Sequence, residues 1–202
     1  MIKRIWALIL ALVLGISGLT ACTGKVVTGN GNPQEDVGTV ATKDPGTLKM
    51  GLSLTAMVTN EKDATNEGSG SAKVDVMAVA VTVDEAGVIR HCSIDQIPAE
   101  LTFDHKGALT TELNTEFPSK NEMGSEYGMK KASDINKEWD QQAKAFADYV
   151  TGRTLEEVGK IPTDEGGKTT EPELLSSVTI SVTDFMKGVA LAVRNANRQG
   201  TM

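Results

Sequence analysis

The alternation of apolar and polar residues between positions 48 and 97 constrains the fold of this chain more than any other feature. From Leu48 to Thr59 every second residue is apolar, which predicts a strand with one buried face. The segment 73–83 is apolar on both faces in its second half, as a central strand covered on both sides would be. The apolar positions of the first strand are Leu48, Met50, Leu52, Leu54, Ala56 and Val58.

A turn and a third strand follow directly. The run Asp84-Glu85-Ala86-Gly87 is a turn signal with a glycine available for a positive φ. The segment 88–97 then alternates again, so the two segments around the turn predict an antiparallel hairpin. Two further short strands, 101–103 and 108–111, are expected around His105-Lys106-Gly107.

The character of the sequence changes at Ser133, which can cap a helix that runs to Tyr149 or Val150. Gly152 stops the run. Thr154-Leu155-Glu156-Glu157 is typical of a capping box that starts a short second helix. The apolar stripe of the first helix consists of Ile135, Trp139, Gln142, Ala143, Phe146 and Val150.

A last helix is expected to begin near Thr183, with Gly200 just past its end. Its stripe consists of Phe185, Val189, Ala192, Val193 and Ala196. Strands followed by helices predict an α+β fold, in which helices pack on one face of a twisted antiparallel sheet. We expect one domain from residue 47 to residue 202.

The N-terminal residues have the parts of an export signal. Lys3 and Arg4 precede an apolar run from Ile5 to Ile16. A membrane-spanning helix needs roughly 20 apolar residues, so the run favours a removable signal over a permanent anchor helix. Leu19-Thr20-Ala21-Cys22 resembles the lipobox of bacterial lipoprotein precursors. The resemblance implies a signal peptide over residues 1–21.

In such precursors the cysteine receives a diacylglyceryl group before cleavage. The resemblance therefore implies that lipid on Cys22 holds the protein on the bacterial cell membrane, facing the extracytoplasmic side. Residues 22–46 are rich in Gly, Thr, Asn and Pro and poor in large apolar residues. This composition predicts a flexible tether between the lipid and the domain.

The charge of the chain argues against nucleic acid as a partner. The formal net charge is −7, and removal of Lys3 and Arg4 with the signal peptide takes it to −9. Phosphate binding needs clustered basic residues. The acidic balance also argues against docking on anionic lipid headgroups.

Cys92 is the one thiol left if Cys22 carries lipid, so no internal disulfide is expected. A lone thiol in an exported protein can be a nucleophile or can pair with another chain. Alternation places Cys92 beside Ile94 on one strand face, with Val88 and Arg90, and this favours a buried structural thiol.

No metal site and no catalytic residue set is predicted. His91 and His105 have no ligand spacing with a cysteine or a carboxylate pair. The chain lacks a nucleophile elbow, a phosphate-binding loop and a dinucleotide glycine motif. Enzymatic activity thus stays uncertain, and the sequence favours an electron carrier or a binding protein.

The passage 173–181 directly precedes the last expected helix. With the hairpin at residues 74–94, it resembles the FMN-binding domain of the flavin-carrying subunits of sodium-pumping quinone reductases and related electron-transport complexes. In that family an acidic residue and a Ser/Thr-Gly-Ala-Ser/Thr run precede a helix, and the last hydroxyl is esterified to the FMN phosphate. The matching residues are Glu173 at the acidic position, Ser176 at the first hydroxyl and Thr179 at the acceptor.

The resemblance implies that FMN is bound covalently at Thr179, where a helix N-terminus favours a phosphate. It covers roughly residues 70–196 with a long insertion. Ser177 stands where the family has glycine and Val178 where it has alanine, two positions whose small size gives access to the backbone.

The insertion contains the run 126–133, followed by Trp139. This run resembles a set of small, uncharacterised bacterial lipoproteins. Tyr127 and Lys130 precede the expected helix cap, so one interpretation places them with Trp139 in a ligand-binding cleft. The other interpretation is a loop that packs on the helix.

Two functions therefore remain open. The first is a lipid-anchored electron carrier of the FMN-binding type, with a redox partner in the cell envelope, because a flavin supplies redox chemistry that the chain otherwise lacks. The second is a cofactor-free lipoprotein that acts as a ligand-binding or interaction module.

Overall fold

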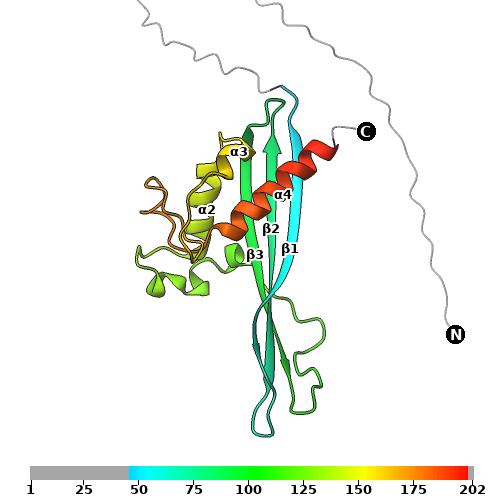
Figure 1. The fold of residues 1–202 in the computed structure, drawn as a ribbon. Helices are drawn as coiled ribbons and strands as arrows, with labels where there is room; N and C mark the ends of the chain where they lie inside the picture. Colours follow the sequence, from blue (N-terminus) through cyan, green and yellow to red (C-terminus); the bar gives the residue numbers. More distant parts are fainter. Residues whose placement is uncertain (1–45, 200–202) are drawn as a thin grey trace, which may run out of the picture. The chain divides into compact units, whose positions relative to one another are not determined.

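Three antiparallel strands in the order β1-β2-β3 form the sheet of the computed structural model, which describes residues 46–199 (Figure 1). The strands are β1 (Lys49–Lys62), β2 (Gly70–Val83) and β3 (Ile89–Phe103). The expected signal peptide, Cys22, residues 22–45 of the expected tether and Gly200 lie outside the described residues. Residues 46–199 belong to a single compact unit.

The turn between β2 and β3 is built as the sequence predicts. Gly87 has a φ of +79° and donates its N–H to the carbonyl of Asp84. The Oδ1 atom of Asp84 accepts hydrogen bonds from the N–H groups of Ala86 and Val88. This turn fixes the register, and residues across the whole of β2 pair with β3.

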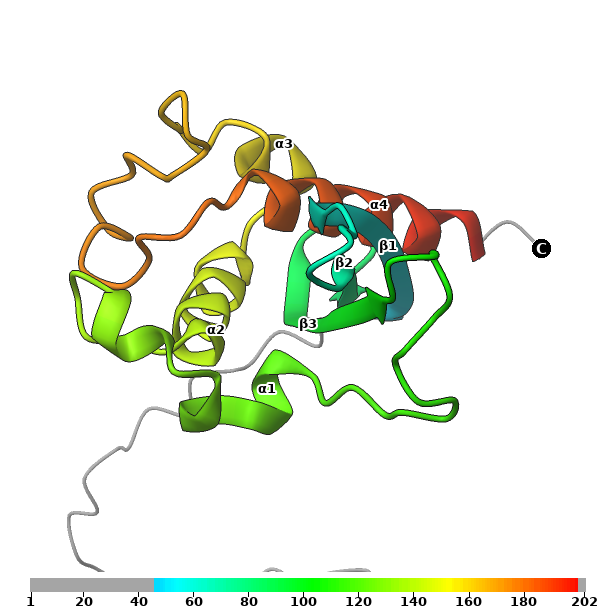
Figure 2. The ribbon, with the colours of Figure 1, turned by 90° about the horizontal axis from the view of Figure 1, so that it is seen from below.

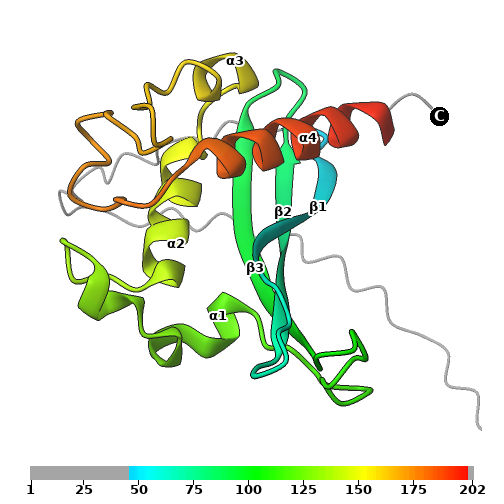
Figure 3. The ribbon, with the colours of Figure 1, turned by 60° about the horizontal axis from the view of Figure 1, so that its bottom comes forward.

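The helices pack on one face of this sheet, which confirms the expected α+β fold (Figure 2). Helix α4 (Thr183–Gln199) crosses β1 and β2, and α2 (Trp139–Val150) lies beside β3 (Figure 3). The remaining helical segments are α1 (Lys120–Met123), η1 (Gly124–Tyr127), η2 (Met129–Ala132) and α3 (Leu155–Val158).

The core lies between the sheet and helices α2 and α4. The stripes predicted for the two helices are buried there, apart from Ile135, which precedes α2 and is half-buried. Phe185 contributes most of the ring contacts: it packs edge-on against Trp139, with ring centroids 5.7 Å apart, and against Phe146 at 5.6 Å. Among the described residues, no helix is both long enough and apolar enough to cross a bilayer.

The predicted buried face of β1 is wrong: its large apolar residues point away from the helices. Gly51 and Ser53 face α4 instead, and both are buried. A β-carbon at Gly51 would lie 2.0 Å from the backbone oxygen of Ala192, so the strand and the helix approach each other almost backbone to backbone. The close approach decides which face is covered, and only very small residues fit there.

The predicted start of α2 is also wrong. The helix begins at Trp139 rather than after Ser133, because Glu138 and Gln141 form a capping box at that point. Asn136 has a φ of +53°, which interrupts any helix before it. Ser133 instead accepts a hydrogen bond from the buried amide of Gln142. The end at Val150 agrees with the prediction.

Strand β3 is longer than predicted and contains a bulge. It absorbs residues 101–103, expected as a separate strand, and Phe103 forms an isolated bridge with Leu109. The register shifts opposite Val83, so Arg90 is the extra residue and does not share the face of Cys92. Arg90 pairs with Asp84 at 2.6 Å instead.

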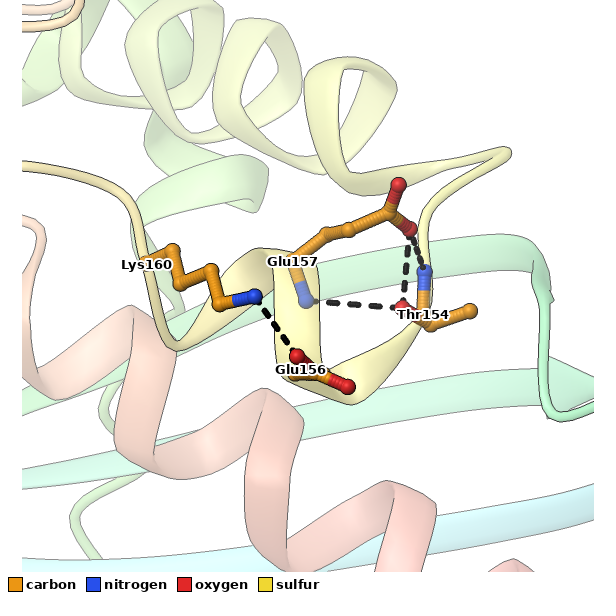
Figure 4. Close-up of polar contacts among 4 residues, drawn as sticks. All are labelled: Thr154, Glu156, Glu157 and Lys160. Carbon is orange, nitrogen blue, oxygen red and sulfur yellow. Dashed lines mark hydrogen bonds and ion pairs between the residues drawn. The ribbon is translucent and has the colours of Figure 1, made fainter.

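The predicted capping box at the start of α3 is confirmed (Figure 4). Glu157 donates its backbone N–H to the hydroxyl of Thr154 at 3.4 Å, and its carboxylate accepts the backbone N–H of Thr154 at 2.7 Å. Lys160 pairs with Glu156 one turn away at 2.6 Å. The single turn of α3 thereby places Val158 in the core.

Candidate functional site

Thr179, the predicted flavin acceptor, lies on the loop four residues before α4. It is half-buried, and both its backbone N–H and its hydroxyl donate to Oε1 of Gln142, at 2.9 and 3.3 Å. Gln142 is fully buried on α2 and bonds through its amide nitrogen to Ser133 and to the carbonyl of Lys137. Thr179 therefore fastens the loop before α4 to helix α2.

The other two predicted cofactor residues do not converge on Thr179. Ser176 is exposed on the turn before it. Glu173 is also exposed and pairs with Arg153 at 3.3 Å, while the Arg153 guanidinium stacks on the ring of Tyr149. The acid therefore helps to attach this loop to the end of α2.

An FMN phosphate on Thr179 would lie beside Val178 and Ser177, the two residues that precede it in sequence. Val178 is buried, so its side chain points into the core and does not cover the acceptor hydroxyl. Ser177 accepts a hydrogen bond from Nζ of Lys137 at 3.2 Å, which places one cation near the acceptor. An ester at Thr179 would require its hydroxyl to give up the hydrogen bond to Oε1 of Gln142.

A buried lysine, which the sequence did not single out, forms a second polar cluster. Lys120 is only 6% exposed, and its Nζ lies 4.9 Å from the ring centroids of both Tyr127 and Trp139. The same Nζ donates to Oε1 of Gln96 on β3 at 3.0 Å. The rings of Tyr127 and Trp139 thus both lie against the amine of Lys120. Lys130, the third residue of the cleft that one interpretation of the sequence expected, is exposed.

Asp75 on β2 faces the same region and is 7% exposed. Its Oδ1 has no hydrogen-bond partner among the described residues. Desolvation by burial lowers the pKa of Lys120 to about 8, against the attraction of the Asp75 carboxylate. Burial also raises the pKa of the Tyr127 phenol. The cluster holds α1 and η1 against the sheet, and Lys120 itself fills its centre.

A pocket of about 320 Å³ opens between the edge strand β3 and helix α2. Three polar residues one turn apart on α2 form one wall, and Asn121 of α1 closes the end by donating to the carbonyl of Ile94 at 3.0 Å. The lining residues are His91, Cys92, Ser93, Ile94, Asn121, Asp140, Lys144, Ala147 and Asp148.

The electrostatics of this pocket are acidic. Lys144 pairs with Asp148 at 2.6 Å, which leaves the charge of Asp140 without a cation in the lining. The Oδ1 atom of Asp140 has no hydrogen-bond partner among the described residues. A bound group that carries a positive charge or hydrogen-bond donors fits such a lining better than an anion does.

Cys92 borders the pocket but is not activated. It is buried, as expected, and desolvation raises the pKa of its thiol to about 12, which keeps it protonated at neutral pH. His91 and His105 are exposed. Within residues 46–199, no group of three or more His, Cys, Asp or Glu side chains is placed to hold a metal ion.

The sequence missed both the lysine cluster and the pocket. Lys120 lies just after Ser119 at the start of a capped helical turn, a position typical of an exposed lysine. The spacing of Asp140, Lys144 and Asp148 places them on one helical face. The same spacing is found on helix faces that are simply exposed to solvent, so it does not predict a pocket. The chain matches no known family model, no curated protein and no solved structure.

Proposed function

We propose that residues 46–199 form a ligand-binding module that holds a small molecule non-covalently in the pocket between β3 and α2. The observation that carries the proposal is Asp140, a carboxylate in the pocket lining whose charge no cation of that lining balances, because Lys144 pairs with Asp148. A positively charged group bound in the pocket would balance this carboxylate.

The lining indicates the class of ligand. The apolar side chains of Ile94 and Ala147 and the neutral thiol of Cys92 suit a short carbon chain. Asp140 suits an ammonium group, and about 320 Å³ is at the small end of the range for ligand pockets. We therefore propose a small amine as the ligand class.

The proposal is tested by the thermal stability of the full chain in the presence of putrescine and spermidine, with acetate as the anion control. The amines should raise the melting temperature saturably, because a ligand that binds only the folded state stabilises it. Asp140→Asn should abolish the shift. Asp134→Asn, the same substitution at an exposed aspartate outside the pocket, should retain it.

A shift that is equal in both variants, or absent from the parent protein, would contradict the assignment. Loss of the shift in Asp140→Asn counts only if the unliganded variant melts close to the parent. This condition is needed because Asp140 lies in the first turn of α2, where a negative charge stabilises the helix, so the substitution by itself lowers stability slightly.

The second proposed feature is the lipid anchor at Cys22, which lies outside the described residues. Its support is the resemblance of residues 19–22 to a lipobox and the short apolar run before it. We propose an extracytoplasmic position on the bacterial cell membrane. Replacing Cys22 with Ala should move the protein from the membrane fraction to the soluble fraction or leave it unprocessed; unchanged fractionation and processing would contradict the anchor.

An FMN-dependent electron carrier is the second candidate function. The observation that favours it is the inward direction of Val178, which removes one obstacle to the hydroxyl of Thr179, with Lys137 nearby as a cation for the phosphate. A bound flavin would supply the redox chemistry itself. A redox partner in the cell envelope belongs to this candidate.

In-gel flavin fluorescence tests the carrier directly. The carrier function predicts a fluorescent band that disappears in Thr179→Val and persists in Thr170→Val, a matched change at an exposed threonine of the same loop. A non-fluorescent parent protein, purified from cells that flavinylate another protein, would rule this candidate out.

A further inference from the structure

The pocket between β3 and α2 runs along the edge of the sheet. Four consecutive residues of β3 line it, namely His91, Cys92, Ser93 and Ile94. Consecutive side chains of a strand point to opposite faces, and here His91 and Ser93 are exposed whereas Cys92 and Ile94 are buried in the core. A cavity on one face would be lined by every second residue. This pocket therefore borders the backbone of β3, which is an outer strand of the sheet.

The strand pairing shows which backbone groups of β3 point toward the pocket. In an antiparallel sheet, the N–H and C=O groups of successive residues point alternately to the two sides of the strand. The carbonyl of Ile94 points away from β2, because it accepts a hydrogen bond from Asn121 of α1. Cys92 lies two residues before Ile94 with no register shift between them. Its N–H and C=O groups therefore also point away from β2.

The unpaired part of this edge is short. At one end, the carbonyl of Ile89 accepts from the N–H of Gly152 at 2.7 Å. At the other end, Asn121 occupies the carbonyl of Ile94. Between these contacts, the N–H and C=O of Cys92 and the N–H of Ile94 have no hydrogen-bond partner within residues 46–199. Unpaired groups on a strand edge are a template for another extended chain.

Helix α2 runs antiparallel to β3 along this edge (Figure 3). Its end lies at Ile89, because Gly152 follows the helix and donates to Ile89. Its start lies near Gln96, because the amine of Lys120 bonds to Gln96 and lies 4.9 Å from the ring centroid of Trp139. The two ends of the pocket therefore differ in which part of the helix faces them.

Asp140 is the second residue of α2, so its carboxylate lies at the Ile94 end of the pocket. The charge of Asp140 has no cation in the lining, because Lys144 pairs with Asp148 at 2.6 Å. A cationic group is therefore favoured at this end, next to the unpaired backbone groups of β3.

We propose that the ligand of this pocket is a short peptide with a free N-terminus, which adds to the edge of β3 as an antiparallel strand. The inference rests on the proposed function, and it identifies the bound amine as the N-terminal ammonium group of the peptide. This ammonium group lies at Asp140, and the peptide runs from there towards Ile89. Because Asn121 closes the pocket at the Ile94 end, the site takes the start of a chain rather than an internal segment.

The pairing of this peptide follows from the free groups of β3. The first peptide residue lies opposite Ile94, and its carbonyl accepts the N–H of Ile94. The third residue lies about 7 Å further along, opposite Cys92, and exchanges two backbone hydrogen bonds with it. A polyamine offers only donors and leaves both N–H groups of β3 unpaired. Each residue of an extended peptide offers one donor and one acceptor, so a peptide satisfies the edge and a polyamine does not.

Titration calorimetry of the full chain in mild detergent tests the inference with trialanine amide, whose small side chains suit a pocket of about 320 Å³. This peptide should bind at least about tenfold more tightly than putrescine, because it adds hydrogen bonds to Cys92 and Ile94. Acetylation of its N-terminus, or Asp140→Asn in the protein, should abolish binding.

Two ester analogues of the peptide give a matched comparison. An ester oxygen in place of the amide nitrogen of the third residue removes the donor to the carbonyl of Cys92, and should weaken binding about fivefold. The same replacement at the second residue removes an N–H that points away from β3, and should leave the affinity nearly unchanged.

Nuclear magnetic resonance locates the contact. Addition of trialanine amide should shift the amide proton signals of Cys92 and Ile94. The signal of Ser93 should shift less, because its N–H points toward β2.

The outcomes separate this inference from the proposed function. If putrescine binds through Asp140 but the two esters bind equally well, or the acetylated peptide binds as tightly as the free one, the peptide strand is overturned and the amine pocket stands. If neither putrescine nor trialanine amide binds, both the peptide strand and the amine pocket are overturned.

Discussion

The hydroxyl of Ser53 donates a hydrogen bond to the backbone carbonyl of Gly188 across 2.8 Å, and it joins residues 135 positions apart. This bond marks the place where α4 rests directly on β1. Gly188 is itself so close to β2 that a β-carbon would lie 2.6 Å from Val79. Asn195 adds a second link, since its amide donates to the carbonyl of Leu52 at 2.8 Å.

Substitution of Gly51 should therefore destabilise the protein more than its small size suggests. The β-carbon of Gly51→Ala would meet the backbone of Ala192, which cannot move without shifting α4. We expect a loss of about 1–3 kcal/mol in the free energy of unfolding, measured by urea denaturation. Gly159→Ala is the control, because its β-carbon would make only ordinary contacts of 3.5 Å. Equal stability of the two variants would contradict the close packing.

The same contact shows what the sequence could and could not predict. Alternation correctly predicted that residues 48–59 form a strand, because the period follows from backbone geometry. It did not predict which face is covered, because Leu54 is apolar whether it faces a helix or solvent. The residues that α4 covers, Gly51 and Ser53, are not hydrophobic. They are buried because α4 approaches the strand closely at these two small residues.

Local signals predicted local structure in the rest of the fold. Thr154 caps α3 and Gly87 closes the hairpin, because both depend on neighbouring residues alone. Lys120 could not be foreseen, since its burial depends on Gln96, Tyr127 and Trp139 from three separate elements. The candidate pocket likewise forms only where β3 and α2 meet.

The capping box at α3 gives a simple stability prediction. Thr154→Ala removes the hydroxyl that accepts from the backbone N–H of Glu157 (Figure 4). The free energy of unfolding should fall by about 1 kcal/mol in a urea titration. Thr170→Ala, at an exposed position, should change it by less than about 0.5 kcal/mol. A neutral Thr154→Ala would mean that the turn contributes nothing to stability.

Cys92 should make the protein sensitive to alkaline pH. Its thiol has a pKa of about 12 in the folded state and an ordinary value near 9 when unfolded, so the unfolded state loses its proton first. Stability is thus complete below pH 9 and falls as the pH rises from 9 towards 12. In Cys92→Val this part of the fall should be missing. The difference between the two unfolding curves from pH 8 to 11 measures it, and parallel curves would contradict a buried thiol.

Lys120 should have the opposite effect at slightly lower pH. Its pKa is about 8 in the folded state and 10.5 when unfolded, so between these values the unfolded state binds the extra proton. The free energy of unfolding should therefore rise from pH 8 to pH 10.5, relative to Lys120→Met, in which the titrating group is absent.

Lys130→Met, a matched change at an exposed lysine of the same segment, should follow the pH profile of the parent protein. The measurement is urea denaturation of the parent and the two variants at half-unit steps of pH. If Lys120→Met and Lys130→Met gave the same profile, the amine of Lys120 would not be desolvated in solution.

The most direct test of the proposed binding function is mass spectrometry of the full chain isolated from its own membrane, recorded under native and denaturing conditions. We predict a ligand mass that is present in the native spectrum, is lost on denaturation and is absent from Asp140→Asn. An FMN-sized increment that survives denaturation and maps to Thr179 would contradict the binding module and establish the flavin carrier in its place.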